Sequence, residues 1–332
     1  MKKFKEFIGI DISKLKFDIR IHSNQIASVF DNNNTGFKKM VNWVLKNVDC
    51  DKEEILFALE HTGLYSLPIS VFLSENKFHF ILLPGLEIKR SLGIQRGKND
   101  KIDAKRIAEY AYQKKDKIVP SQLPFKNILQ IRRLLKLRER LVKYRAGFLK
   151  DKSENKIFLN AKENKLLFEI VDKSIIELNK KIDKIEKEID IIVESDTLIS
   201  KQFYLITSIK GVGKQTALFV IAYTNCFSNF DNWRKFASYC GTAPFPYSSG
   251  TSIKGRNKVS PLANKKIKSL LNQCARSSII CNPEMKLYYK TRKEKGDNGM
   301  SIMNIIRNKM ISRIFAVIRR GTPYVDTYKF AA

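Results

Sequence analysis

The stretch of sequence that decides the fold is FIGIDIS, residues 7–13. Its apolar residues form a short run interrupted by Asp11, a pattern typical of a buried strand that carries one carboxylate. A lone charge in an apolar strand costs free energy unless it is paired or holds a metal ion. Asp11 is therefore the first candidate for a metal ligand.

Short strands and helices alternate around this stretch through the first third of the chain. Strands are predicted at residues 7–12, 17–21, 26–30, 55–59 and 78–83, with SKLK as a hairpin turn after the first of them. Helices are predicted at residues 37–45, 64–73 and 102–112. This order predicts an α/β domain over residues 1–125, with a mixed sheet in an RNase-H-like arrangement and helices on its faces.

Three further carboxylates lie at positions that suit the same metal site. Glu60 stands at the carboxyl end of the predicted strand ILFALE, where open α/β sheets form sites. Asp100 and Asp103 are three residues apart at the start of the next helix, so they share a face. Each acid taken alone is better explained as structural; Asp100, for example, is equally well explained as a helix N-cap. Together the four can hold two Mg²⁺ ions, with Mn²⁺ as the alternative metal.

The chain as a whole is strongly basic. Lys and Arg total 62 against 33 Asp and Glu, a net charge of +29. The excess lies in residues 1–150, with 30 basic and 16 acidic side chains, and in residues 201–332, with 23 and 5; residues 151–200 carry 9 and 12. A chain this cationic is suited to bind a polyanion. Carboxylates in such a basic chain are best explained as holding Mg²⁺ against phosphate. The sequence therefore predicts an enzyme that cuts or rejoins nucleic acid.

Several other classes of protein are not expected. No run of about 18 apolar residues is present, so the sequence predicts no membrane span. The stretch at residues 1–13 lacks the cleavage site of a signal peptide. Five cysteines without a CxxC pair, and only three histidines, do not suggest structural zinc. The expected location is the reducing cytoplasm, in association with the nucleoid.

The middle of the chain, residues 126–200, carries the clearest helical periodicity. A helix at 129–149 precedes a second one whose apolar residues alternate in steps of three and four. This seam consists of Phe168, Val171, Ile175, Leu178, Ile182, Ile185, Ile189 and Ile192. The pattern predicts a coiled coil, and two alternatives stay open: a hairpin within one chain, or an interface between two chains.

The last third, residues 201–325, is predicted to be mainly helical. The segment IKGVGKQTALFVIA, residues 209–222, resembles a helix-hairpin-helix turn, whose backbone N–H groups can bind a phosphate. Lys210, Gly211, Gly213 and Lys214 would form that contact, although a tight turn before a helix explains the glycines almost as well. A short helix at 230–239 precedes GTAPFPYSSGTSIKG, which is predicted to be a Gly/Pro/Ser loop.

The loop and the two basic helices that follow it, at 264–280 and 302–319, supply the remaining candidates. Ser248 and Ser249 lie in the loop, and a serine hydroxyl is a weak nucleophile until it is activated. Serine in such a loop is usually turn chemistry. Phosphate contacts are predicted for Lys254, Arg256, Lys265, Lys266, Lys268 and Arg276, and for Arg307, Lys309, Arg313, Arg319 and Arg320, with solvated helix faces as the alternative.

The motifs FIGIDIS, ALEHTG, KNDKIDAKRIA, IKGVGKQTA and GTAPFPYSSGTSIKG occur in the order seen in transposases of the insertion sequence 110 family, also called Piv/MooV-type DEDD recombinases. The chain resembles that family from about residue 5 to residue 320. The resemblance implies a RuvC-like N-terminal domain, a coiled-coil connection and a C-terminal transposase domain. It also implies that Asp11, Glu60, Asp100 and Asp103 bind Mg²⁺, and that Ser249, or otherwise Ser248, attacks DNA to form a phosphoserine intermediate.

The resemblance further implies partners. These are donor and target DNA, a non-coding bridge RNA whose base pairing selects the DNA, and further copies of the chain in a dimer or tetramer with a composite active site. Two alternatives use the same acids or the same charge: a RuvC-type junction resolvase or nuclease that activates water, and a non-catalytic nucleic-acid-binding scaffold. The chain departs from the family in KVSPLANKK, which contains Pro261 and Asn264 and no glycine; asparagine tolerates a left-handed conformation, which would allow the turn to be kept.

Overall fold

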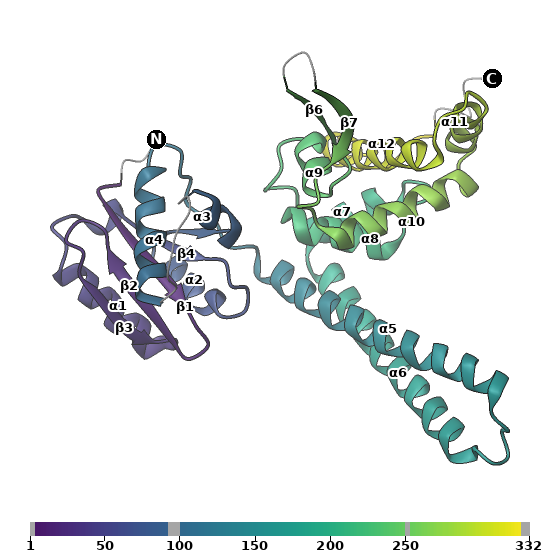
Figure 1. The fold of residues 1–332 in the computed structure, drawn as a ribbon, viewed down its shortest axis with the longest axis horizontal. Helices are drawn as coiled ribbons and strands as arrows, with labels where there is room; N and C mark the ends of the chain where they lie inside the picture. Colours follow the sequence, from purple (N-terminus) through teal and green to yellow (C-terminus); the bar gives the residue numbers. More distant parts are fainter. Residues whose placement is uncertain (1–3, 92–99, 250–252, 327–332) are drawn as a thin grey trace. The chain divides into compact units, whose positions relative to one another are not determined.

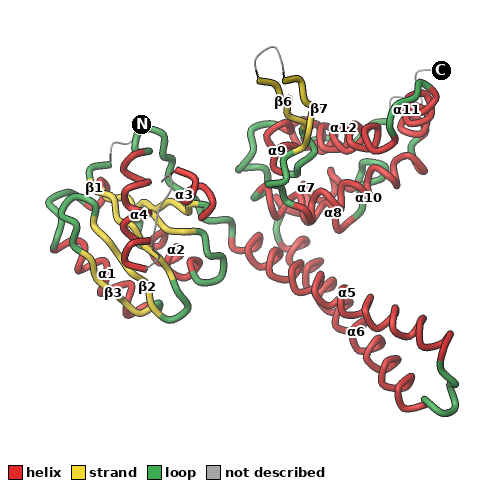
Figure 2. The backbone as a smooth tube through the Cα atoms, in the orientation of Figure 1, coloured by secondary structure: helices red, strands yellow, loops and turns green. Residues whose placement is uncertain are grey.

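The structure, a computed structural model, describes residues 4–91, 100–249 and 253–326. The chain forms two compact units, Met1–Leu123 and Pro124–Ala332 (Figure 1). The first is built on a sheet, and in the second helices predominate (Figure 2). Among the described residues, no helix is long and apolar enough to cross a membrane.

The sheet of the first unit has five strands in the order β3-β2-β1-β4-β5. β1, β2 and β3 are antiparallel neighbours, whereas β4 pairs with β1, and β5 with β4, in parallel. The mixed sheet that the sequence predicted is therefore confirmed, with each strand close to its predicted position. The strands are β1 (Glu6–Ile12), β2 (Lys16–Ile21), β3 (Ala27–Asp31), β4 (Ile55–Glu60) and β5 (His79–Leu83).

Helices cover both faces of this sheet. Residues of β1 alternate between two cores, Ile8 and Ile10 in the one with α1 and α2, and Phe7 in the one with α3 and α4. The sequence did not predict α3, a short helix directly after Pro84, or the 3-10 turn Lys52–Glu54 before β4. The helices are α1 (Asn34–Lys46), α2 (Ser66–Glu75), α3 (Gly85–Ser91) and α4 (Asp100–Gln113).

Gly9 lets the backbone of α4 approach β1 closely. A Cβ atom at this position would lie 2.1 Å from the carbonyl oxygen of Ala104 and 2.5 Å from the nitrogen of Ala108. On the same face of β1, the Phe7 ring contacts the Tyr112 ring edge-on, with 5.7 Å between centroids. β1 and α4 therefore run in opposite directions: Phe7 lies near the carboxyl end of α4, and Gly9 lies closer to its amino end.

The second unit begins with a long antiparallel helical hairpin, formed by α5 (Lys126–Phe158) and α6 (Lys165–Ser195). All eight residues of the predicted seam in α6 are at least partly buried, and Ile185, Ile189 and Ile192 share a core with residues of α5. The seam therefore packs within one chain, the first of the two alternatives. Polar contacts also join the two helices. Arg138 forms an ion pair with Glu186 at 2.5 Å, Lys152 forms one with Asp172, and Arg145 donates a hydrogen bond to Asn179 at 2.8 Å.

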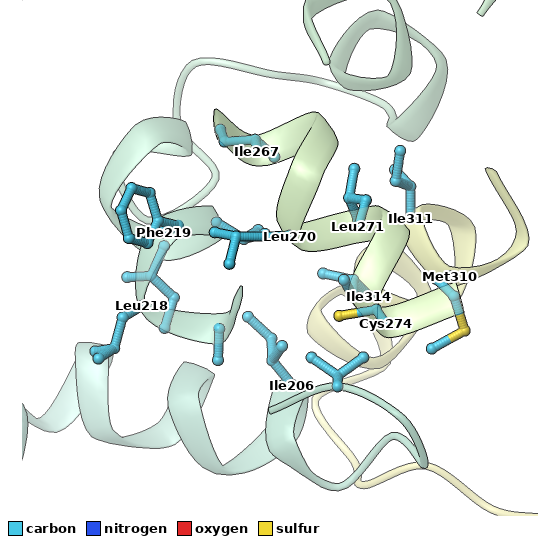
Figure 3. Close-up of a cluster of buried hydrophobic side chains, with 14 of the residues drawn as sticks. Ile206, Leu218, Phe219, Ile267, Leu270, Leu271, Cys274, Met310, Ile311 and Ile314 are labelled. Carbon is cyan, nitrogen blue, oxygen red and sulfur yellow. The ribbon is translucent and has the colours of Figure 1, made fainter. Parts of the chain in front are cut away.

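The rest of the second unit packs around α8, which is buried along most of its length. Side chains of α7, α8, α10 and α12 meet in one core, shown in Figure 3. All five cysteines are free, and burial raises the pKa of the Cys240 and Cys274 thiols. The helices are α7 (Thr197–Thr207), α8 (Lys214–Thr224), α9 (Trp233–Tyr239), α10 (Lys265–Cys281), α11 (Pro283–Glu294) and α12 (Gly299–Arg320); α7 and α11 were not predicted.

The predicted Gly/Pro/Ser loop is wrong in one respect, because most of it forms a two-stranded hairpin. β6 (Pro244–Ser249) pairs antiparallel with β7 (Ile253–Val259). Its two prolines argued against a strand, since proline cannot donate a ladder hydrogen bond. The pairing accommodates Pro246 with a register shift between Phe245 and Tyr247, and Pro244 opens the strand.

Substitution of Gly9 tests the close approach of α4. Gly9→Ala is expected to lower the free energy of unfolding of the first unit by at least about 1–3 kcal/mol, because the new methyl group overlaps backbone atoms of α4. Denaturant unfolding followed by circular dichroism measures the change. As a control, Gly147→Ala in exposed helix α5, where no atom lies within 4 Å, should stabilise by about 0.5–1 kcal/mol. Equal effects at both positions would contradict the packing.

Truncation of the seam tests the helical hairpin. Ile189 is 0% exposed, so Ile189→Ala should cost about 2–5 kcal/mol of unfolding free energy. Ile191 is 60% exposed on the same helix, so Ile191→Ala should change it by less than about 1 kcal/mol. The midpoint of urea unfolding at several protein concentrations gives both values. A concentration-dependent loss in Ile189→Ala would instead place the seam between chains.

Candidate functional site

Asp11 and Glu60 lie side by side at the carboxyl ends of two parallel strands. Ile10 pairs with Leu59 in the β1–β4 register, so Asp11 and Glu60 are the next positions along both strands. Strand alternation places both acids on the face covered by α4, because Phe7 of β1 and Ala58 of β4 belong to that core. Both acids are partly exposed.

Asp103 reaches the same face of the sheet from the first turns of α4. Because Gly9 meets Ala104, the strand position two residues further on, Asp11, lies toward the amino end of that helix. Asp103 accepts a hydrogen bond from Arg106 at 2.8 Å. The fourth predicted ligand, Asp100, begins α4, and its side chain lies outside the described residues.

The carboxylate of Glu60 folds over the start of α3. A Cβ atom at Gly85 would lie 1.9 Å from Oε1 of Glu60, so a larger residue there would require this flexible side chain to move. The Glu60 carboxylate therefore lies against the backbone at the start of α3.

Carboxylate oxygens are the ligands that Mg²⁺ prefers, so the donor set fits this ion in kind. In the part of the chain that the structure describes, however, no three His, Cys, Asp or Glu side chains lie close enough to hold a metal. Asp103 is engaged with Arg106 instead. The fold thus brings three of the four predicted ligands to one face of the sheet, and their assignment as metal ligands stays a prediction.

Asp18 is a fourth acid at this face, and it was missed by the sequence analysis. It pairs directly with Asp11 across the antiparallel β1–β2 register, and it is partly exposed. The hairpin turn SKLK was recognised, and the register that follows from it would have revealed the pair.

The predicted nucleophiles lie in the second unit, at the end of β6. Ser248 is exposed and pairs with Lys254, and Ser249 pairs with Ile253. The side chains of Ser249, Lys254 and Arg256 lie outside the described residues. The strand ends at Ser249, so either serine would be presented by a hairpin and not by an irregular loop.

The base of this hairpin is fastened to α12. The carbonyl oxygen of Thr242, two residues before β6, accepts hydrogen bonds from Asn304 at 2.8 Å and from Asn308 at 3.0 Å. The Thr242 hydroxyl is also hydrogen-bonded to the Asn308 side chain, at 3.0 Å, and the residue is fully buried. These contacts fix where the hairpin leaves the helical core.

The glycine turn between α7 and α8 is explained by packing. Gly211 has φ +92°, and a Cβ atom there would lie 2.8 Å from the Cβ of Ser278 in α10. Gly213 is the N-cap of α8. The flanking lysines are already paired, Lys210 with Asp326 at 2.7 Å and Lys214 with Asp190 at 2.5 Å. These contacts favour the tight-turn alternative over a phosphate contact, which stays untested.

Some cations of the basic helices form ion pairs with described acids, and others do not. Lys266 pairs with Glu139 at 3.0 Å and Arg313 with Glu284 at 2.6 Å, whereas Arg276 is exposed. Arg307 is only 6% exposed, so the alternative of a solvated face is wrong for this residue. Lys265 and Lys268 line a pocket together with it.

The turn before α10 does not use the left-handed conformation that asparagine tolerates. Asn264 has φ −71°, so it is not left-handed; its side chain accepts a hydrogen bond from the Ile267 nitrogen and caps the helix. The left-handed residue nearby is Gly241, with φ +66°, where a Cβ atom would lie 2.5 Å from the Cβ of Ala263. An asparagine N-cap is what a helix start favours, and this explains the absence of a glycine there.

Comparison with known proteins agrees with both halves of this arrangement. Residues 8–153 match a family model described as a transposase, of the DEDD type of IS110, and residues 204–290 match one described as the transposase IS116/IS110/IS902 family. The first match spans Asp11, Glu60 and both aspartates of α4. The second spans the serine hairpin.

Individual relatives cover nearly the whole chain. The pilin gene-inverting protein of Moraxella bovis is 25% identical over 332 residues, which include 96% of this chain and 98% of that protein. The protein of the same name from Moraxella lacunata gives the same figures. An uncharacterized 43.6 kDa protein of insertion element IS110 from Streptomyces coelicolor is 29% identical over 140 residues, 42% of this chain and 33% of that protein. With both halves matched in order, the chain belongs to the IS110 family of transposases.

Proposed function

We propose that this protein is a DNA recombinase that cuts and rejoins DNA through a covalent phosphoserine intermediate, with Ser249 as the nucleophile. Asp11, Glu60, Asp100 and Asp103 would hold Mg²⁺, or Mn²⁺ in its place. The observation that carries the proposal is the placement of Asp11, Glu60 and Asp103 on one face of the sheet, around the contact between Gly9 and α4.

The charge arrangement supports the metal part of the proposal. Asp11 faces Asp18 across the strand pair and lies beside Glu60, so several carboxylates share one edge of the sheet. Carboxylate oxygens gathered in this way are the ligands that a divalent cation such as Mg²⁺ prefers. A bound Mg²⁺ would neutralise charge on the scissile phosphate. Arg106 would then release Asp103, whose present ion pair occupies an oxygen that the metal needs.

The covalent step needs no outside source of energy. The Ser249 hydroxyl oxygen would bond to phosphorus, the bond from phosphorus to the sugar oxygen would break, and that oxygen would leave as a hydroxyl with a proton. Attack by a hydroxyl of another DNA strand would then restore a phosphodiester and free the serine. Because one phosphate ester replaces another, the energy of the broken bond is kept.

Rejoining is favoured over simple hydrolysis by the nature of the relatives. The two Moraxella proteins are named for inverting a gene, and an inversion must join the ends that it makes. A RuvC-type nuclease that uses water would leave the ends apart. A bridge RNA that selects donor and target DNA, and a composite site shared between copies of the chain, complete the proposal on the strength of the family resemblance.

A covalent-trapping assay tests the nucleophile. The protein is purified with its flanking RNA co-expressed, mixed with Mg²⁺ and supercoiled target DNA, and run on a denaturing gel. Wild type should give a protein–DNA adduct, Ser249→Ala none, and Ser248→Ala a normal amount. Cleaved DNA without an adduct that persists in Ser249→Ala would reject the serine mechanism in favour of the water-using nuclease.

Metal dependence is tested in the same assay. Chelation by EDTA should abolish the adduct, and added Mg²⁺ should restore it. Asp11→Asn should lower the rate of adduct formation about 10²–10³-fold, because the neutral amide binds a cation poorly. The exposed acid at the end of β3 provides the control, and Asp31→Asn should react like wild type. An adduct that forms at full rate in EDTA would refute the metal site.

A further inference from the structure

A cationic pocket of about 930 Å³ lies at the base of the serine hairpin. Its walls come from the ends of β6 and β7 and from the first turns of α10 and α12. Lys258, Lys265, Lys268 and Arg307 line it. Among its described lining residues there is no aspartate or glutamate. The pocket therefore gathers positive charge without internal neutralisation.

Arg307 is the buried cation of this pocket. Its side chain donates hydrogen bonds to the amide oxygens of Asn272, at 2.7 Å, and of Asn304, at 3.4 Å, while its Nε is buried without a hydrogen-bond partner. It forms no ion pair with a described carboxylate, and burial lowers the pKa of its guanidinium. A charge that is 6% exposed and unpaired destabilises a protein unless an anion binds it.

The surroundings of Arg307 add to the preference for an anion. α10 and α12 both begin at the pocket, with Asn264 and Asn298 as their N-caps, so the positive ends of two helix dipoles are directed there. The lysines Lys258, Lys265 and Lys268 form no ion pair with a described acid. In contrast, the neighbouring Lys266 and Arg313 are each matched with a glutamate.

We propose that this pocket binds a backbone phosphate of DNA, with the guanidinium of Arg307 as its buried contact and the three lysines around it. The chemistry recognised is the phosphodiester anion, for which a planar guanidinium is the preferred partner. The choice of DNA as the polymer rests on the proposed recombinase function. The pocket itself rests on the burial and the unpaired Nε of Arg307.

The phosphate in this pocket is not the one that the serine attacks. Pro244 and Val259 pair at the base of the hairpin, beside the pocket, and Ser249 lies five residues further along β6. At about 3.3 Å per residue this is roughly 16 Å. This distance is too long for one phosphate group to contact both Arg307 and Ser249, so two different phosphates are involved. Arg307 is thus a positioning residue.

A hydrogen-bonded link joins the pocket to the hairpin. Asn304 accepts from Arg307 through Oδ1 and donates through Nδ2 to the Thr242 carbonyl, directly before β6. A phosphate bound to Arg307 would therefore hold the DNA at a set distance from the serine strand. Contacts of this kind fix the register of a protein on DNA without reading its sequence.

The test measures the salt dependence of DNA binding by the full chain. Fluorescence anisotropy of a labelled 30-bp DNA duplex gives Kd between 50 and 300 mM KCl, in EDTA so that neither cleavage nor adduct contributes. Arg307→Met should weaken binding roughly tenfold and reduce the slope of log K against log salt by about 1. Arg307→Lys, which keeps the charge, should retain the slope. Thermal unfolding of each variant is recorded alongside.

Arg313→Met is the matched control, because Arg313 lies on the same helix and its charge is neutralised by Glu284. It should keep the slope and lower Tm, whereas Arg307→Met should lower the slope and leave Tm unchanged or higher. Lys258→Met changes an exposed position and should also lower the slope. It provides the test of the pocket if Arg307→Met does not fold.

An unchanged slope in Arg307→Met and Lys258→Met, with Tm lowered in Arg307→Met, would overturn the proposal and make Arg307 a structural residue. If Arg307→Met lowered the slope of log K against log salt for an RNA duplex but not for a DNA duplex, the assignment to DNA would be overturned. The adduct assay is independent of this result. If Arg307→Met lowers the slope but wild type forms no adduct, the phosphate pocket is supported and the serine mechanism is rejected. If wild type forms an adduct but Arg307→Met leaves the slope unchanged, the serine mechanism is supported and the phosphate pocket is rejected.

Discussion

The contact between Gly9 and the backbone of α4 is the constraint on which the first unit depends. A glycine in the middle of a strand weakens the strand by itself. Here it is required, because any side chain would overlap Ala104 and Ala108. The helix therefore lies directly on β1, and its first turns reach the edge where Asp11 and Glu60 end their strands. Without that approach, a helix at ordinary distance would carry Asp103 away from the two strand carboxylates.

The cations of the second unit follow a division that the net charge of +29 does not reveal. Lys210, Lys214, Lys266 and Arg313 are each matched with a carboxylate, so they stabilise the helical core and its hairpin. The cations around the β6–β7 base have no such match among the described acids. Unmatched charge is costly to fold, and its concentration beside the serine hairpin is the reason for proposing a phosphate site there.

Much of the fold and of the candidate site could be predicted from local pattern. The five strands of the sheet and the seam of α6 follow from the runs and periodicity of apolar residues, because these side chains are buried against neighbouring elements. Asp11 and Glu60 stand out because charges in apolar strands are rare, and Asp100 and Asp103 because their spacing places them on one face of a helix. The hairpin at β6 was missed because Pro244 and Pro246 argue against a strand, and the register shift that accommodates Pro246 cannot be read locally. The helices α7 and α11 were not predicted.

The sequence by itself determined the five strands of the sheet and the longer helices, the excess of positive charge and the identity of the acids and serines. These depend on residue type and short-range spacing. Only the tertiary structure decided that the α6 seam packs within one chain, that Asp18 faces Asp11, and that Arg307 is buried without a carboxylate. Each of these depends on which surfaces meet across long sequence separations, and helical or strand periodicity is the same whichever partner covers the face.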